Sequence, residues 1–526
     1  MSAAPQMPNA ASAAGEWDAE LTDIAQRRAT AEAMGGEAAI ARQHEQGKLS
    51  ARERIDYLLD DGSFRELGAL TGKAKYGEDG VLKEFVPSNS IIGSGRIEDR
   101  KVSVTADDFT IRGGSSESAN ADKWIYAERL AQQMKMPLIR LVDTAGGSVK
   151  LLDQMQSTKI PGYPNWPLVP LLEEVPVVGV ALGACAGLGA MKVLASHFSV
   201  MVKETSQVFA AGPPVVKQAF GVVIDKNDLG GYQVHSRKSG MVDNEAEDER
   251  DALDQVRRFL SYLPRNRWEL PPVLACADDP NRAEDWLKDA IPRNRRKVYD
   301  PRRIIAAIVD SGSLFEIGRY HGASTITALA RLNGKPVGIM ANDPRVLGGA
   351  MTAAAAAKTE RFVELCDTFH LPVVNFVDQP GNMTGLEAEL AGTLAAAVRL
   401  LKVIERSSTP WMSVIVRRAF GVAGGMHGRK QGRDGRSLNH RIAWPSARWG
   451  SIPVEGGVAA AYRKDIAAAE DPEARRLELE EHYHRLASPM RTAERFGIVD
   501  IVDPRETRSL LCEWVDDVWD VLKTEI

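Results

Sequence analysis

Glycine-rich turns that follow apolar runs are the residues of this chain best suited to chemistry. Two lie in the first half of the sequence, at 143–147 (DTAGG) and 183–187 (GACAG), and two in the second half, at 378–382 (DQPGN) and 421–425 (GVAGG). Where a strand ends in glycine, no side chain shields the backbone N–H groups, so they can reach a ligand. A pair of N–H donors from two such turns is the usual construction of an oxyanion hole.

An internal duplication relates the turns of the two halves. Gly113 corresponds to Gly348 and Asp143 to Asp378, and the members of each pair are 235 positions apart. A repeat of this length indicates two whole domains rather than the short units of a solenoid. Two similar domains would supply two oxyanion holes.

The expected elements repeat in the same order: a hairpin of two strands, a Gly-Gly turn, a helix and a strand. In the first half the hairpin, the helix and the strand are expected at 88–108, 118–134 and 137–147. In the second half they are expected at 325–343, 355–369 and 372–382. These ranges leave out the Gly-Gly turn. A further helix, strand and glycine elbow complete each half. Strands that alternate with helices at this spacing predict parallel β-α-β units. We therefore expect an α/β protein of two tandem domains.

The chain is expected to divide into a tail and two domains. Residues 1–18 lack the basic start and continuous apolar stretch of a secretory signal, and they are typical of a disordered tail. The boundary between the halves lies in the charged stretch 243–303. We predict an N-terminal domain at 19–270 and a C-terminal domain at 271–526.

Composition excludes several classes of protein. The 526 residues are 44% hydrophobic and 26% charged, as in globular proteins of two or more domains. A net charge of -5 does not indicate a broad nucleic-acid surface. The four cysteines form no CxxC pair, which favours a reducing cytoplasm over a disulfide scaffold or zinc ribbon. The longest apolar run, 176–191, is shorter than the roughly 18 residues of a membrane span, so no membrane segment is expected.

Longer motifs surround the glycine turns and follow one order along nearly the whole chain. They include GKLSARERIDYLLDDGSF at 47–64, FAAGPPVVK at 209–217, DLGGYQVHSRKSG at 228–240, KTERFVELCDTFHLPVVNFVDQPGN at 358–382 and IVDIVDPRETR at 498–508. In these motifs the chain resembles the carboxyltransferase (β) subunits of biotin-dependent acyl-CoA carboxylases, such as those for propionyl-CoA and methylcrotonyl-CoA. The resemblance implies two tandem crotonase-like (ClpP/crotonase) domains, each a β-β-α superhelix.

The resemblance also implies a reaction. In that family a carboxyl group passes from carboxybiotin to the α or γ carbon of an acyl-CoA, which reacts as its enolate. Both partners pass through an oxyanion, one on the thioester and one on the biotin ureido oxygen, so two sets of preorganised donors are needed. No side-chain base or nucleophile is required, which agrees with the lack of a convincing catalytic triad in this sequence.

Site residues follow from the resemblance. Those expected to hold the thioester oxygen are Gly147, Ala186, Gly187 and Leu188, and those expected to hold biotin are Gly381, Val422, Ala423 and Gly424. Further substrate-binding residues are expected at Gly113, Gly114, Gly146, Asn382 and Gly425. No metal site is expected, since no metal-ligand spacing joins His427, His440, His482 and His484.

Departures from the family pattern bear on the acyl group. The second glycine of the usual Cys-Ala-Gly-Gly elbow is Leu188, and the usual Gly-Gly-Ala-Tyr-Asp reads GVAGG at 421–425. Glycines in place of Tyr and Asp should widen the acyl pocket. Residues 212–214 and 235–240 look more like methylcrotonyl-CoA carboxylases. We therefore expect a branched or larger acyl group.

Biotin is expected to come from a partner. Met134-Lys135-Met136 mimics a biotin-acceptor motif but lies within a domain, before a strand, rather than on a small carrier domain. The expected partners are a biotin carboxyl carrier and a biotin carboxylase, which would use ATP and bicarbonate. The family further implies a homo-oligomer, a hexamer, with active sites between the first domain of one subunit and the second domain of its neighbour.

Two other hypotheses for function stay open at this point. One is a biotin-dependent decarboxylase that runs the transfer in reverse; the other is a noncatalytic scaffold with the same fold. Two conspicuous features are expected to be structural. The basic residues at 293–303 fit a domain linker better than a nucleic-acid site. Cys185 fits a small buried position better than a nucleophile.

Overall fold

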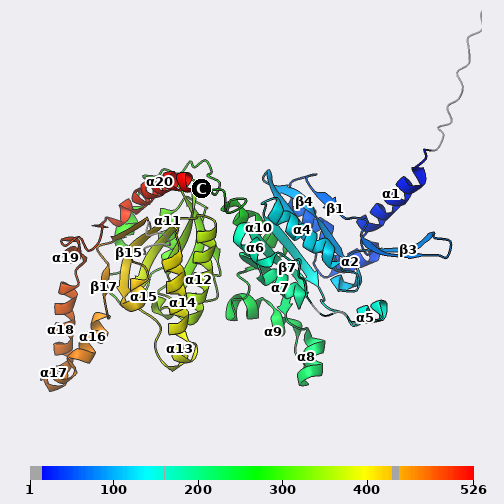
Figure 1. Ribbon diagram of the computed structural model, residues 1–526. Helices are drawn as coiled ribbons and strands as arrows, with labels where there is room; N and C mark the ends of the chain where they lie inside the picture. Colours follow the sequence, from blue (N-terminus) through cyan, green and yellow to red (C-terminus); the bar gives the residue numbers. More distant parts are fainter. Residues whose placement is uncertain (1–14, 159, 161, 429–437) are drawn as a thin grey trace, which may run out of the picture.

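Two halves of similar architecture lie side by side in the protein (Figure 1). The computed structural model describes residues 15–158, 160, 162–428 and 438–526. Most of the predicted tail, residues 1–14, therefore lies outside the described residues, and the first helix already begins at Asp18.

An eight-stranded sheet forms the first half. Its strands are β1 (Arg65–Leu67), β4 (Ser90–Ile97), β5 (Arg100–Asp107), β6 (Leu138–Thr144), β7 (Val177–Ala186), β8 (Phe198–Val202), β9 (Gln207–Phe209) and β10 (Asn244–Ala246). The order across the sheet is β1-β4-β5-β6-β7-β8-β10, and β9 pairs with the end of β7. The β4–β5 hairpin is antiparallel, whereas β5 to β8 run parallel. A separate hairpin consists of β2 (Gly72–Tyr76) and β3 (Leu82–Pro87).

The sheet of the second half repeats this topology. Its strands are β11 (Phe315–Ile317), β12 (Thr325–Leu332), β13 (Lys335–Asn342), β14 (Val373–Gln379), β15 (Trp411–Phe420), β16 (Asn439–Ala443), β17 (Arg448–Gly450) and β18 (Asp500–Ile501). The order is β11-β12-β13-β14-β15-β16-β18, with β17 paired to β15 as β9 is to β7. β14 begins and ends 235 residues after β6, and β15 begins and ends 234 residues after β7. The predicted α/β class and the internal duplication are confirmed.

Helices cover both sheets. Those of the first half are α1 (Asp18–Glu32), α2 (Glu37–Glu45), α3 (Ala51–Leu58), α4 (Ala121–Gln133), α5 (Lys150–Met155), α6 (Leu168–Glu174), α7 (Leu188–Leu194), α8 (Pro213–Phe220), α9 (Lys226–Gly230) and α10 (Glu249–Ser261). Those of the second half are α11 (Pro301–Ile308), α12 (Ala353–Thr368), α13 (Leu386–Leu390), α14 (Thr393–Arg406), α15 (Gly421–Gly425), α16 (Val454–Ala461), α17 (Arg463–Ala468), α18 (Pro472–Leu486), α19 (Pro489–Ala493) and α20 (Thr507–Glu525). The short α7 and α15 follow the central strands β7 and β15, so they occupy matching places in the two halves.

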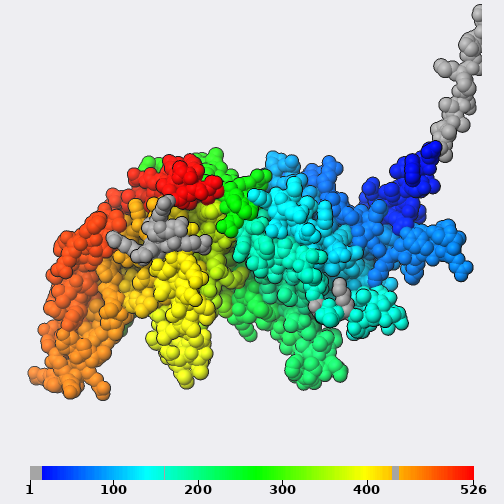
Figure 2. Space-filling model, in the orientation of Figure 1, coloured from blue at the N-terminus to red at the C-terminus, as the bar shows by residue number. Residues whose placement is uncertain are grey.

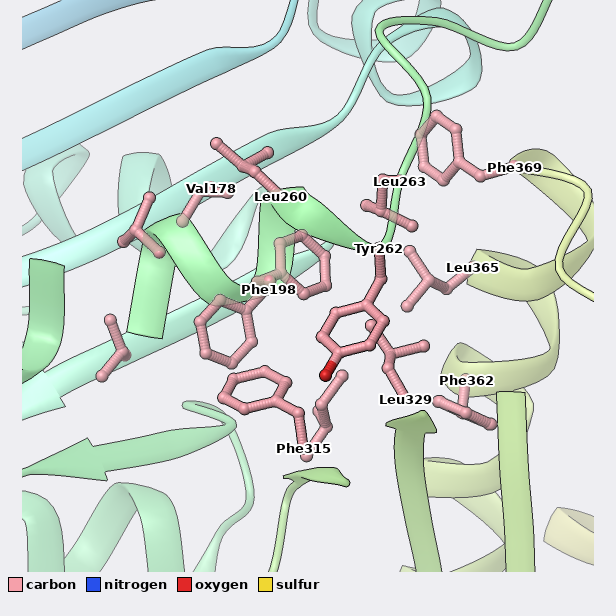
Figure 3. Close-up of a cluster of buried hydrophobic side chains, with 14 of the residues drawn as sticks. Val178, Phe198, Leu260, Tyr262, Leu263, Phe315, Leu329, Phe362, Leu365 and Phe369 are labelled. Atoms are coloured by element: carbon pink, nitrogen blue, oxygen red, sulfur yellow. The ribbon is translucent and has the colours of Figure 1, made fainter. Parts of the chain in front are cut away.

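A shared hydrophobic core fixes the two halves against each other. Figure 3 shows aromatic side chains from both halves in contact, among them Phe198 and Tyr262 from the first and Phe315 and Phe362 from the second. The ring centroids of Phe198 and Phe315 are 5.6 Å apart in an edge-on arrangement, which is favourable beyond the burial of area alone. Because α12 contributes Phe362, it forms part of the contact with the first half.

The chain passes from one half to the other just after α10. Arg267 still donates its backbone N–H to Glu174 O in the first half, whereas Leu274 donates to Gly334 O in the second. The boundary between residues 270 and 271 stays a prediction for this interval.

Candidate active site

The two glycine turns of the first half lie against each other at the ends of β6 and β7. Gly146 has a φ of 83°, and a Cβ at this position would lie 2.9 Å from the carbonyl oxygen of Ala186. Only glycine permits this approach and this backbone conformation. Gly187, with a φ of 58°, then turns the chain from β7 into α7. The predicted turns at 143–147 and 183–187 therefore form one structure.

The Gly113-Gly114 turn packs beside this structure. A Cβ on Gly114 would lie 2.4 Å from the carbonyl oxygen of Asp143. The Thr144 hydroxyl donates to Gly114 O at 2.6 Å and accepts the N–H of Gly146 at 3.0 Å. These two glycines, predicted to bind substrate, thus also support the turn that precedes Gly147.

Two backbone donors remain open at the first elbow. Leu188 is the first residue of α7, where a helix has no internal acceptor for its N–H. Neither the Leu188 N–H nor that of the exposed Gly147 has an acceptor among the described residues. The Gly187 N–H, by contrast, donates to Phe209 O at 3.0 Å. Among the residues expected to hold the thioester oxygen, Gly187 therefore supplies the bend between β7 and α7. Its own N–H is occupied by an acceptor within the chain.

The second elbow repeats this arrangement. Gly421, with a φ of 63°, turns β15 into α15. The N–H groups of Val422 and Ala423, in the first turn of α15, have no acceptor among the described residues. The Gly381 N–H is occupied within the chain, as that of Gly187 is, because it donates to the side-chain oxygen of Gln379 at 3.1 Å. Val422 is 69% exposed, so this elbow is open to a ligand.

The second turn is less tightly packed than the first. Gly381 has a φ of 133°, yet no atom lies within 4 Å of an ideal Cβ there. Asn382, the counterpart of Gly147, lies next to Met351 in an isolated parallel bridge. The two elbows therefore share one open donor position, that of Leu188 and Val422, but differ in the space beside it.

A buried carboxylate fixes the end of β6, directly before the first turn. Asp143 is fully buried and forms ion pairs with Lys48 at 2.6 Å and with Arg54 at 3.1 Å. Arg54 also pairs with Glu249 at 2.6 Å. A Cβ on Gly183 would lie 2.1 Å from the Asp143 carboxylate, so this position requires glycine.

The position of Arg54 depends on how α3 begins. Ser50 caps the helix by accepting the N–H of Glu53, and the Glu53 carboxylate accepts the N–H of Ser50 at 2.7 Å. This capping box satisfies two otherwise unpaired donors at the start of the helix. It fixes the helix from which Arg54 reaches Asp143.

Asp378 has the equivalent position at the end of β14 but different partners. Arg417 and Arg418, both on β15, pair with it at 2.9 Å and 2.6 Å. The Tyr299 hydroxyl also donates to Asp378, at 2.9 Å. Burial, and next the charge of Asp378, raise the pKa of Tyr299 well above its ordinary value, so the hydroxyl stays a neutral donor.

Sequence reasoning missed both sets of cationic partners. The repeated Asp143 and Asp378 were visible in the sequence, as were Arg417 and Arg418 just before the second elbow. Lys48 and Arg54 could not be assigned, because nothing in the sequence indicates which strand end α3 and the residues before it will approach.

Other conspicuous residues have structural surroundings. Cys185 is fully buried and its Sγ donates to Val142 O at 3.3 Å; burial raises the pKa of the thiol, which disfavours the thiolate. Lys135, within the motif that mimics a biotin acceptor, places its Nζ 3.9 Å from the ring centroid of Trp268. Arg302, from the basic stretch, pairs with Asp343 at 2.5 Å.

Two classes of feature are not found in the part of the chain that the structure describes. No group of three or more His, Cys, Asp or Glu residues there could hold a metal ion. Within the same residues, no helix combines the length and the apolar character needed to cross a membrane.

Comparison with known proteins places the chain in a family. Residues 42–520 match the family model described as the carboxyl transferase domain. The chain is 35% identical to the carboxyltransferase subunit of propionyl-CoA carboxylase from Haloferax mediterranei, over 93% of this chain and 94% of that protein. It is 34% identical to methylmalonyl-CoA decarboxylase subunit alpha from Veillonella parvula, over 92% of each.

A solved structure agrees with these relatives. The crystal structure of transcarboxylase 12S, described as a hexamer assembly with methylmalonyl-coenzyme A bound, matches with a TM-score of 0.85 and 32% identity, over 97% of this chain and 96% of that one. The predicted family and fold are thereby confirmed. Because the family model spans residues 42–520 and both curated relatives cover at least 92% of the chain, the protein belongs to the carboxyl transferase domain family, the carboxyltransferase subunits of biotin-dependent acyl-CoA carboxylases.

Proposed function

We propose that this subunit transfers a carboxyl group from biotin, attached to a separate carrier subunit, to an acyl-CoA that reacts as its enolate. One observation carries the proposal: each repeated half ends its central strand in a glycine elbow whose first N–H groups have no acceptor among the described residues. Preorganised N–H donors of this kind stabilise a developing oxyanion. The duplication supplies one set for each of the two oxygens that gain charge.

The first elbow is suited to the thioester. The N–H groups of Gly147 and Leu188 would hold the thioester oxygen, and they would bind it more strongly as it becomes the enolate oxygen. The nearby Asp143 carboxylate would oppose that negative charge if it stood alone. Its ion pairs with Lys48 and Arg54 neutralise it, so the elbow keeps the positive potential of its N–H groups.

The second elbow is suited to biotin. The N–H groups of Val422 and Ala423 would hold the ureido oxygen, and biotin supplies the carboxyl group that is transferred. Val422 and Gly425 are exposed, so a ring system on a mobile carrier can approach. The ion pairs of Asp378 with Arg417 and Arg418 leave no unbalanced carboxylate beside this elbow.

Carboxyl fixation tests the proposal. The subunit is mixed with a biotin carboxylase and a biotin carboxyl carrier, together with ATP, labelled bicarbonate and a panel of esters from acetyl-CoA through methylcrotonyl-CoA to geranyl-CoA. We expect ATP-dependent incorporation of label into at least one ester. The reverse result, loss of carboxyl from a malonyl-type ester without ATP and no fixation, would assign the chain to the decarboxylating relatives. Neither activity, with an active carboxylase partner, would favour a scaffold.

Association of subunits follows from the proposed chemistry. The two elbows must face each other across the transferred carboxyl group, but within one chain they lie in different halves, with α12 packed between α15 and the first half (Figure 1). A second copy must therefore bring its second elbow to the first elbow of this chain. The hexamer described for transcarboxylase 12S is consistent with this arrangement.

Exposed apolar side chains lie where such a copy could bind. Leucine or valine recurs every four residues along α13 and α14, and the exposed side chains are Leu386, Leu390, Leu394 and Val398. Figure 2 shows that α13 and α8 form two projections from the same edge of the molecule, with a hollow between them. On α8, Phe220 is 77% exposed. Apolar side chains gathered in this way mark an interaction surface.

Leu390→Asp is expected to break the assembly, because a carboxylate buried at the subunit contact would lose its hydration without a partner. Leu390 is 74% exposed in the single chain, so the monomer should still fold. The mass measured by light scattering should fall, and fixation should fall with it. Val521→Asp on α20, at the opposite edge in Figure 1, serves as the matched control. Equal masses for both variants would exclude this surface.

A further inference from the structure

A largely buried ion pair joins α7 to the end of β5 in the first half. Lys192, in the last turn of α7, places its Nζ 3.6 Å from the carboxylate of Asp107, the last residue of β5. The two side chains are 8% and 12% exposed. The second carboxylate oxygen of Asp107 is buried without a hydrogen-bond partner among the described residues, so Lys192 is its counterion. The pair therefore acts on the helix whose first N–H, that of Leu188, is open at the first elbow.

The second half has neutral residues at the two matching positions. Asn342 is the last residue of β13 and lies 235 positions after Asp107. Met426 follows the elbow glycine of the second half by five residues, as Lys192 follows Gly187 in the first. Since both halves have the same sheet topology, the fold does not require a charged pair at this point. The pair is an addition to the first half alone.

Asn342 ties the end of its strand to the neighbouring Gly-Gly turn. Its Oδ1 accepts the N–H of Asp378 at 3.0 Å and its Nδ2 donates to Gly349 O at 3.3 Å, so a backbone donor and a backbone acceptor fix the orientation of the amide. In the first half the Thr144 hydroxyl makes the corresponding bond to Gly114 O, at 2.6 Å. A side-chain donor at the end of β5 is therefore not needed, and a carboxylate can stand there and pair with α7.

Lys192 makes a second contact, with an aromatic ring of α4. Its Nζ lies 4.5 Å from the ring centroid of Trp124, within the range of a cation–π interaction. Leu188, one turn earlier on the same face of α7, packs against the small buried cluster to which Trp124 belongs. Val422, the counterpart of Leu188, is 69% exposed, so its side chain does not hold the second elbow in this way.

Such a pair contributes geometry more than stability. The cost of burying two charges largely cancels their attraction, so the pair adds little to the free energy of unfolding. Lys192, however, meets both its anion and its aromatic ring only when α7 has one position. An N–H donor weakens steeply when it is tilted away from its acceptor. The position of α7 therefore decides how well its first N–H can serve a ligand.

We propose that Asp107 and Lys192 are positioning residues for the first elbow: through α7 they aim the Leu188 N–H at the thioester oxygen as that oxygen gains charge. The inference rests on the proposed function, which assigns the thioester to this elbow. In this assignment neither side chain touches the substrate. Because the donor binds the enolate more strongly than the ester, loss of the pair should lower kcat more than it changes KM.

The second half supplies the test variant. Asp107→Asn combined with Lys192→Met gives the first half the residues with which the second half already folds, and it leaves no buried charge without a partner. The double variant should keep the urea midpoint and the mass of the wild type. In the fixation assay its kcat should fall about tenfold, a part of what a whole donor is worth, with KM for the acyl-CoA within about twofold. If the double variant does not fold, Lys192→Met alone tests the same point, because burial raises the pKa of Asp107 and favours its neutral form.

Three further variants separate positioning from a general effect of the lost charges. Asp79→Asn with Lys83→Met makes the same chemical change in an exposed ion pair on the β2–β3 hairpin and should leave kcat unchanged. In a Leu188→Pro background, where the donor is absent, the test substitutions should cost nothing more. In a Val422→Pro background they should still cost about tenfold, because the first elbow keeps its donor there.

Hydrogen exchange of the subunit alone separates this inference from the proposed function. The amides at the start of α7 should exchange faster in the double variant than in the wild type, whether or not any ester is carboxylated. If the wild type fixes no ester but exchange is faster, the pair still holds α7 and the proposed function fails. A kcat equal to that of the wild type, an effect confined to KM, or unchanged exchange overturns the inference, and the proposed function then stands on its own assay.

Discussion

Replacing Val422 with proline is expected to slow carboxyl transfer by about a hundred- to a thousand-fold, the typical cost of losing one oxyanion-hole donor. Proline removes the backbone N–H, and at this position little else is lost. Val422 is in the first turn of α15, where proline is tolerated because the N–H has no acceptor within the helix. Its side chain is 69% exposed, so packing changes little. The measurement is kcat for fixation on the preferred ester.

Val422→Ala is the matched control, because it shortens the side chain and keeps the N–H. It should retain activity within about twofold if the donor is what matters. Leu188→Pro and Leu188→Ala form the same pair at the first elbow, where the half-buried Leu188 begins α7. If proline and alanine variants of the same residue have equal rates, the backbone donor at that elbow has no role in the reaction.

The architecture was the part most accessible from the sequence. Turns, strand ends and close backbone approaches are fixed by local residue types, and glycine at a required positive φ has few substitutes. Gly146 and Gly381 could therefore be paired across 235 positions, and both lie at the predicted strand ends. The parallel order followed from the alternation of helices and strands, because such crossovers place successive strands side by side.

The availability of each N–H donor could not be predicted in the same way. The Gly187 N–H is occupied because the short strand β9 brings Phe209 O to it, and the Gly381 N–H is occupied by the side chain of Gln379. The first acceptor is placed by the tertiary fold, and the second depends on the side-chain rotamer of Gln379. For the same reason the glycine-rich motif at 421–425 predicted more space, but only Gly425 leaves its surroundings open.

The two repeated carboxylates, Asp143 and Asp378, have partners that the sequence repeat does not predict. Asp143 and Asp378 are repeated, yet Lys48 and Arg54 neutralise the first from α3 and the residues just before it, whereas Arg417 and Arg418 neutralise the second from the adjacent strand. The burial of each carboxylate requires positive partners. It does not specify which element supplies them.

Asp143→Asn is therefore expected to destabilise the fold by about 3–5 kcal/mol, the usual result of removing one partner from a buried ion pair. The side chain keeps its shape, but Lys48, which is 6% exposed, is left buried without its anion, while Arg54 keeps only Glu249. The midpoint of urea denaturation, followed by circular dichroism, should fall clearly below that of Asp153→Asn, the same substitution at an exposed site on α5. Equal midpoints for the Asp143→Asn and Asp153→Asn variants would mean that water solvates the Lys48 ammonium group once its anion is removed. Since Asp143 directly precedes the turn that carries Gly147, fixation by the folded fraction should also fall, because the donor is then held less rigidly against the thioester.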